Sequence, residues 1–273
     1  MKKRVTITTI ILSAVVIISC SEDKKSITKP TIPTVTQATV TYLGSAGYML
    51  QSGSTKIMID APYDDFVAQY QVPVCTNTTA QQMAAGEELF SNVDLFLITH
   101  EHRGHFDYDL LGQCFAKNTN AQLITTQGVV NILQRNVQDF DTFQDRIMVP
   151  QLPYDTFIDT TINNISFRIN KSHHWGPVEL INFAFNLKGI EIGFVLEQGE
   201  YVQKNRFDLL FCGGLTSELN NRYIMLCHQS GTATIENLRN QSLSMDKASF
   251  LTVPLESATI LKANSGVQVT LNQ

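Results

Sequence analysis

The sequence has few charged residues and lacks any strongly basic stretch. Only 16% of its 273 residues are Asp, Glu, Lys or Arg, and the formal net charge is −5. Nucleic-acid binding requires clustered Lys and Arg side chains that neutralise phosphates, so this composition argues against a nucleic-acid partner. Hydrophobic residues make up 43% of the chain, which is enough for one large globular domain or two small ones.

The apolar run near the N-terminus is short for a membrane-spanning helix. It follows the basic residues 2–4 and leads to Ser19 and Cys20, a pattern typical of a secretory signal. Residues 17–20, Ile-Ile-Ser-Cys, resemble a bacterial lipobox, which implies cleavage before Cys20 and lipidation of its thiol. We therefore expect a signal peptide over 1–19, a lipidated tether over 20–35 and attachment to the membrane through the N-terminal lipid. This predicts a location in the cell envelope, in the periplasm or at the outer-membrane surface.

Cysteine is scarce as well, with five residues in the chain. Besides Cys20, these are Cys75, Cys114, Cys212 and Cys227. Their spacing fixes no disulfide connectivity. Cys114 lies in a predicted helix, and Cys212 and Cys227 lie in apolar runs, so buried free thiols are the favoured interpretation.

The chain contains no repeat of fixed period, but both of its halves alternate strands with inserted helices. Helices are predicted near 78–90, 107–117, 127–140 and 233–241. Strands are predicted at 38–50, 55–60, 93–98, 123–124, 146–149, 156–159, 164–169, 180–187, 190–197, 207–212, 224–227, 259–262 and 267–271. This order predicts an α/β layered sandwich with a mixed sheet over residues 36–273.

All six histidines lie in three places. The stretch THEHRGHFD, residues 99–107, holds His100, His102 and His105 directly after an apolar strand. His173 and His174 are adjacent, and His228 follows another apolar strand. His100 and His102 are two residues apart in an extended segment, so both rings can point to one side. Zinc accepts imidazole ligands, and a catalytic zinc keeps one position open, so this pattern predicts a metal site.

Residues 93–105 resemble the strand and the His-x-His-x-Asp-His signature of the metallo-β-lactamase superfamily. Residues 40–48 and 56–60 resemble the family's opening strands, and 260–269 resemble its closing strands. The resemblance covers about residues 38–271. It implies a four-layer αβ/βα sandwich and a metal-dependent hydrolase.

The same resemblance implies two groups of metal ligands. The first metal would be held by His100, His102 and one of His173 or His174. His174 is favoured because the family's third histidine comes late in its loop, before a small or glycine-containing segment. The second metal would be held by His105 and His228. Zinc is the expected metal, as one ion or two, with iron or manganese as alternatives.

Two departures from the signature put the second metal in doubt. Gly104 stands where the family has an aspartate, which removes one carboxylate ligand. Glu200 stands where the family's bridging aspartate is expected, and Glu197 competes with it for that role. Asp107 could partly replace the missing carboxylate, although an acid near a helix N-terminus is also favoured by the helix dipole alone. Asp60 matches a family aspartate that forms hydrogen bonds beside the site. Asp60 and Asp107 are therefore the candidate catalytic carboxylates.

Two functions follow as expectations. The first is a lipid-anchored hydrolase that uses a metal-activated water on an ester, lactone or phosphodiester, with a small-molecule or lipid-like substrate. The second is a binding protein on the same scaffold that has lost hydrolysis, which Gly104 and Glu200 favour.

Overall fold

A computed structural model describes most of the chain between residues 37 and 271. The described residues are 37–61, 74–174, 176–196 and 207–213, with the backbone alone of 223–226, 249–250, 258–262 and 270–271. All of them belong to the compact unit Val35–Gln273. The predicted signal peptide, the tether and the helix near 233–241 lie outside the described residues.

The first sheet has eight strands in the order β15-β14-β1-β2-β3-β4-β5-β6. Its strands are β1 (Gln37–Gly44), β2 (Gly47–Ser52), β3 (Thr55–Ile59), β4 (Leu95–Leu97), β5 (Gln122–Ile124), β6 (Ile147–Met148), β14 (Ala258–Lys262) and β15 (Thr270–Leu271). The four strands from β3 to β6 run parallel. β4 is buried on both faces, as its continuous apolar sequence predicts.

The second sheet has seven strands in the order β13-β12-β11-β10-β9-β8-β7. Its strands are β7 (Thr156–Ile162), β8 (Ile165–His173), β9 (Glu179–Leu187), β10 (Ile190–Val195), β11 (Leu209–Cys212), β12 (Tyr223–Leu226) and β13 (Ser249–Phe250). The pairs from β7 to β10 are antiparallel, and those from β10 to β13 are parallel. Both sheets are therefore mixed.

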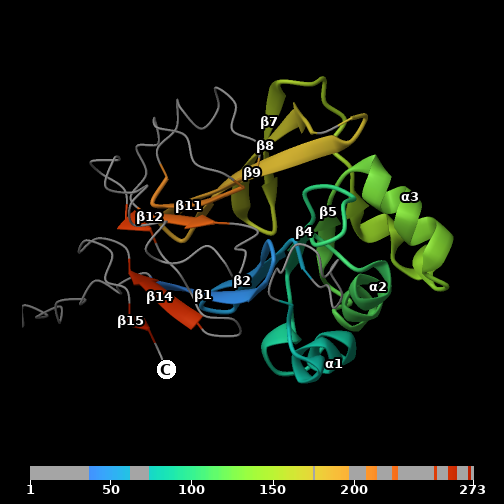
Figure 1. Cartoon of the computed structure of the whole chain (residues 1–273), viewed down its shortest axis with the longest axis horizontal. Coiled ribbons are helices and arrows are strands. Elements are labelled where there is room, and N and C mark those ends of the chain that lie inside the picture. The colour runs from blue at the N-terminus through green and yellow to red at the C-terminus, as the bar shows by residue number, and fades with distance from the viewer. Residues whose placement is uncertain are drawn as a thin grey trace, which may run out of the picture. The chain divides into compact units, whose positions relative to one another are not determined.

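Three α-helices lie beside the parallel strands of the first sheet (Figure 1). They are α1 (Asn77–Ala85), α2 (Tyr108–Lys117) and α3 (Gln127–Asn136). The described residues also form the short 3₁₀ helices η2 (Glu88–Phe90), η3 (Phe140–Thr142) and η4 (Gln144–Arg146). Side chains of Thr76, Asp107 and Thr126 cap the N-termini of the three α-helices. The helix predicted over 78–90 is wrong at its end, because Gly86 has φ 64° and closes α1.

Two apolar layers hold these elements together. One lies between the two sheets, where the rings of Tyr48 and Phe211 are 4.5 Å apart. The other lies between the first sheet and the helices, where Phe96 of β4 meets Phe115 of α2 edge to face. The thiols of Cys75, Cys114 and Cys212 are buried, as the sequence predicts, and burial raises the pKa of Cys114 to about 12. Cys227 lies outside the described residues.

The topology brings several polar segments to one edge of the first sheet. β3, β4 and β5 are parallel neighbours, so the residues that follow them meet at the same edge. These residues are Asp60 after β3, the loop 98–106 after β4, and Thr125 and Thr126 after β5. The Ile181 N–H of β9 donates to the carbonyl of Thr99 at 3.0 Å, which ties this edge to the second sheet.

Candidate metal centre

Three histidines from two distant segments converge at this edge. His100 and His102 lie in the loop after β4, and His174 directly follows β8. One ring nitrogen from each of the three lies within 4.8 Å of the others. His174 Nε2 is 3.1 Å from His102 Nδ1, and the rings of His100 and His102 meet edge to face at 4.8 Å. The geometry therefore gathers three imidazole nitrogens around one point.

Asp60 anchors the buried side of this cluster and is itself fully buried. Its Oδ1 accepts a hydrogen bond from the Thr99 backbone N–H at 2.8 Å. The Thr99 hydroxyl lies 3.0 and 2.9 Å from the two carboxylate oxygens, and His105 Nδ1 lies 2.7 Å from Oδ2. One carboxylate thus holds both the start of the histidine loop and its last histidine.

This network assigns the tautomers of two rings. The single hydroxyl hydrogen of Thr99 goes to Asp60, so Thr99 Oγ1 accepts from Nδ1–H of His100, 3.0 Å away. His105 likewise donates its Nδ1–H to Asp60. In their neutral forms both rings therefore keep a lone pair on Nε2, which is the state that binds a metal.

The histidines of the cluster differ in their exposure to solvent. His100 is 1% exposed and His105 is 2% exposed, whereas His102 is exposed and His174 is half-buried. Partial burial lowers the pKa of His102, the neighbouring His174 lowers it further, and the Glu101 carboxylate opposes both effects. The net effect favours the neutral imidazole.

His173 occupies a different environment from His174. Its ring stacks on Tyr154 with the planes 9° apart and the centroids at 3.8 Å. Among the described side chains, the nitrogens that converge are those of His100, His102 and His174. The sequence left His173 and His174 as alternatives for one ligand, and the convergence favours His174.

The other candidate site residues are placed as follows. Asp107 caps α2, with its Oδ1 accepting from the Leu110 N–H at 2.8 Å, and its catalytic role stays a prediction. His105 packs against His100 with ring centroids 4.0 Å apart. Gly104 is buried and has φ 93°, a backbone conformation that L side chains rarely adopt. The remaining candidates lie outside the described residues: Cys20, Glu197, Glu200 and His228.

Sequence reasoning missed two residues of this loop. Thr99 precedes the histidines, and its hydroxyl links His100 to Asp60. Glu101 lies between the two loop histidines, and its carboxylate rests against the first turn of α3 near Gly128. Only the position of Glu101 inside the motif could have drawn attention to it, because its partner is 27 residues further along the chain.

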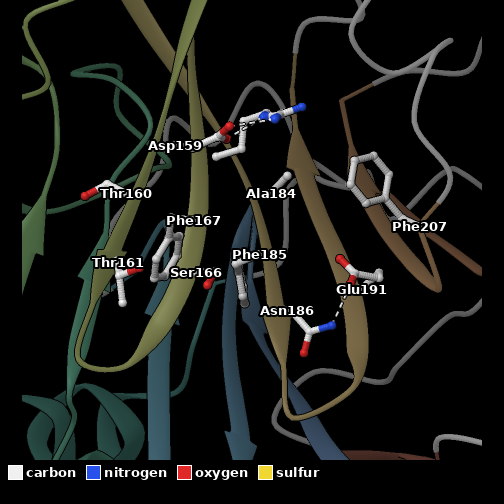
Figure 2. Close-up of a pocket in the computed structure, with 11 residues that line it drawn as sticks. Asp159, Thr160, Thr161, Ser166, Phe167, Ala184, Phe185, Asn186, Glu191 and Phe207 are labelled. Carbon is white, nitrogen blue, oxygen red and sulfur yellow. Dashed lines mark hydrogen bonds and ion pairs between the residues drawn. The ribbon is translucent and has the colours of Figure 1, made fainter.

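A polar pocket, separate from the histidine cluster, lies on the outer face of the seven-stranded sheet and has a volume of about 490 Å³ (Figure 2). Two pairs of its polar side chains interact with each other. Arg168 forms a two-pronged ion pair with Asp159, and Asn186 donates to Glu191. No histidine is among its lining residues. The histidine cluster is therefore the better candidate for chemistry.

The donor set of the cluster fits zinc. Tetrahedral zinc with Zn–N bonds of about 2.0–2.1 Å places its nitrogens roughly 3.3 Å apart. His174 Nε2 and His102 Nδ1 already lie 3.1 Å apart, and the His100 ring is held through its Nδ1 by the Thr99 hydroxyl. Three histidines with an open fourth position are the ligand set of a catalytic rather than a closed structural zinc site.

Comparison with known proteins identifies the family. A profile of the beta-lactamase superfamily domain matches residues 39–229, so the chain belongs to the metallo-β-lactamase superfamily. Comparison with curated protein sequences gave no match.

Solved structures agree on the fold. A protein described as a metal-dependent hydrolase from Parabacteroides distasonis superposes with TM-score 0.53 at 15% identity, covering 79% of this chain and 93% of that one. The metallo-beta-lactamase fold protein YhfI from Bacillus subtilis gives TM-score 0.54 at 14% identity, covering 84% and 100%. CmlA, a diiron β-hydroxylase from Streptomyces venezuelae, gives 0.51 at 10% identity, covering 82% and 54%. The αβ/βα sandwich predicted from the sequence is confirmed.

Proposed function

We propose that this protein is a metal-dependent hydrolase whose first metal is held by His100, His102 and His174. The observation that carries the proposal is the convergence of these three imidazole nitrogens within 4.8 Å. When bound, the metal supplies Lewis acidity and lowers the pKa of a water molecule. Membership of a superfamily with many metal-dependent hydrolases supports this class of reaction but names no substrate.

The chain's own residues prepare the site for that ion. Asp60 and Thr99 fix the rotation and the tautomer of His100 before any ion binds, which lowers the cost of ordering the ligands. The lowered pKa of His102 keeps its ring neutral and available near neutral pH. The exposure of His102 leaves one side of the cluster accessible to a substrate.

We further propose the substrate class and location expected from the sequence. The substrate would be an ester, lactone or phosphodiester of small-molecule or lipid-like character. The protein would be tethered to the cell envelope by a lipid on Cys20. Among the described residues, no helix combines the length and apolar character of a membrane span. Labelling with radioactive palmitate, compared between the wild type and Cys20→Ala, tests the anchor directly.

The metal proposal is tested by metal analysis of residues 36–273 purified without chelator or nickel resin. We expect about one zinc or iron per chain, lost in His100→Ala. A hydrolase screen with ester, lactone and phosphodiester substrates then follows on the loaded protein. If the protein retains no metal and takes up none on titration, the proposal that it is a metal-dependent enzyme is refuted.

One observation favours the alternative, a binding protein without hydrolysis. Gly104 supplies no carboxylate where the family signature has one, and its positive φ suits glycine. In that case the protein would bind metal, and its loaded form would bind but not cleave the substrates of the screen. Direct binding measurements on the same panel separate the two functions.

A further inference from the structure

The side chain between the first two histidines lies against helix α3. Glu101 is the residue between His100 and His102, and its side chain is half-buried. A Cβ added to Gly128 would lie 2.5 Å from the Glu101 Cδ and from Oε2, and 2.7 Å from Oε1. The carboxylate therefore occupies the space that any larger residue at position 128 would fill.

The helix end is a favourable environment for that carboxylate. Gly128 is the second residue of α3, which begins at Gln127 after the cap Thr126. Backbone N–H groups at a helix N-terminus carry partial positive charge, so an anion is stabilised there. The Thr126 hydroxyl, on a residue only 1% exposed, lies 3.5 Å from Glu101 Oε2.

Anchoring Glu101 on α3 restrains the histidine that follows it. Glu101 and His102 lie at a bend of the loop, and the Glu101 side chain leaves this bend toward Gly128 of α3. The rings of His100 and His102 both approach His174, with centroid distances of 4.6 and 4.9 Å. Asp60 and Thr99 hold the His100 end of this segment, and His102 is the exposed end.

We propose that Glu101 is a positioning residue, seated on the N-terminus of α3 in a space left by Gly128, which holds His102 in the metal site. This inference rests on the proposed metal site, although not on hydrolysis. It also gives Gly128 a specific reason to lack a side chain.

Gly128→Ala tests the proposal, because the new methyl group displaces the carboxylate while alanine remains a better helix former than glycine. We expect the zinc dissociation constant, measured by competition with a chromophoric chelator, to rise about tenfold, as for the loss of a group that supports a metal ligand. Glu101→Ala should give a similar rise. Glu101→Gln, which keeps the shape, should recover part of the affinity.

A double-mutant cycle makes the test specific. If Gly128 acts through Glu101, adding Gly128→Ala to Glu101→Ala changes the zinc affinity no further. If the two effects multiply instead, Gly128 acts independently and the proposal is overturned. Unchanged affinity in Gly128→Ala would overturn it as well.

Gly112→Ala in α2 is the matched control, because the new Cβ would lie 2.8 Å from Val137 Cγ1 rather than against Glu101. It should lower the melting temperature without changing the zinc dissociation constant.

A crystal structure of metal-free Gly128→Ala gives a second readout. We expect His102 to leave the triangle of nitrogens, and an unmoved His102 would refute the positioning role. If the wild type binds zinc but cleaves nothing, the proposed hydrolysis fails while this inference stands. If the wild type binds no zinc, the metal-free structures still decide whether Glu101 positions His102.

Discussion

The histidine site has two halves that are built differently. In the buried half, His100 and His105 share Asp60 and Thr99, and every one of these residues is at most 2% exposed. In the open half, His102 is exposed and His174 is half-buried, and His174 Nε2 lies 3.1 Å from His102 Nδ1. One half is held by a carboxylate in the core, and the other faces the solvent.

This difference separates two requirements of a metal site. Ligands must be oriented before binding, which a buried hydrogen-bond network does well because its geometry has few alternatives. The site must also admit an ion and a substrate, which needs exposed ligands. We therefore expect changes in the buried half to reduce stability and metal binding together. Changes in the open half should reduce metal binding alone.

The largest effect is expected for Asp60→Ala. The substitution leaves the Thr99 N–H, the Thr99 hydroxyl and the His105 Nδ1–H without their acceptor in a buried place. Unsatisfied buried donors cost about 1–3 kcal/mol each, so the free energy of unfolding of the metal-free protein should fall by about 3–5 kcal/mol. Urea denaturation followed by circular dichroism measures this.

Asp60→Asn is the control, because the amide oxygen can still accept from Thr99. Its loss of stability should be clearly smaller. Equal stability of the wild type and Asp60→Ala would show that the buried half is not held by this carboxylate.

His102→Ala should have the next largest effect, and on metal binding only. The loss of a direct ligand should weaken zinc binding by at least about 100-fold, the upper end of what loss of a supporting group costs. The unfolding curve of the metal-free protein should stay within about 0.5 kcal/mol of the wild type, as for other exposed positions. Isothermal titration with zinc and urea denaturation give the two numbers.

His173→Ala is the matched control for His102→Ala, because it removes an exposed histidine that stacks on Tyr154. Zinc affinity should be unchanged. A loss of affinity in His173→Ala that equals the loss in His174→Ala would contradict the assignment of the third ligand.

The two halves also differ in how far the sequence predicts them. Residues 93–105 combine a continuous apolar strand with a local histidine motif, so the strand β4 and the loop after it could be predicted. The link from Asp60 to Thr99 depends on β3 and β4 being parallel neighbours, which no local pattern states. The choice between His173 and His174 depends on where β8 ends and how its last residue is turned, and strand ends are the least regular part of a sheet.

The contact of Glu101 with α3 could not be predicted from the sequence either. Its contact with Gly128 joins two segments that are close only after β4 and β5 pair and α3 follows. A glycine near a helix N-terminus lowers helix propensity, so the sequence alone marks Gly128 as a weak point of a helix. The structure shows instead the space that the missing side chain leaves.

The pH dependence of zinc binding should be set by the open half. Burial and the neighbouring His174 lower the pKa of His102 from its ordinary value of 6.5. The folded protein thus binds this proton less tightly than the unfolded chain, so the contribution to stability is present above pH 6.5 and is lost as the pH falls. Zinc competes with the same proton, so affinity should be constant above about pH 7 and decline below about pH 6.5.

Chelator competition between pH 5 and pH 8 measures this decline. The part of the decline in zinc affinity that is lost in His102→Ala is due to protonation of His102. The midpoint of that part should lie below pH 6.5. A midpoint above 6.5 would mean that the Glu101 carboxylate outweighs both the burial of the ring and the neighbouring His174.

The smallest effect is expected at Gly104, on the turn that joins the two halves. Its φ of 93° suits glycine, and another residue forced into such a conformation costs about 1–3 kcal/mol. Gly104→Asp should therefore lower the free energy of unfolding by about 1 kcal/mol, and Gly104→Ala should lower it equally, because the cost lies in the backbone. Metal analysis should show the wild-type stoichiometry in both variants, because we expect the strained turn to keep the new carboxylate from acting as a ligand. Additional metal in Gly104→Asp without loss of stability would contradict this expectation. The turn would then accept a side chain without strain, and only the missing carboxylate would separate this site from a two-metal site.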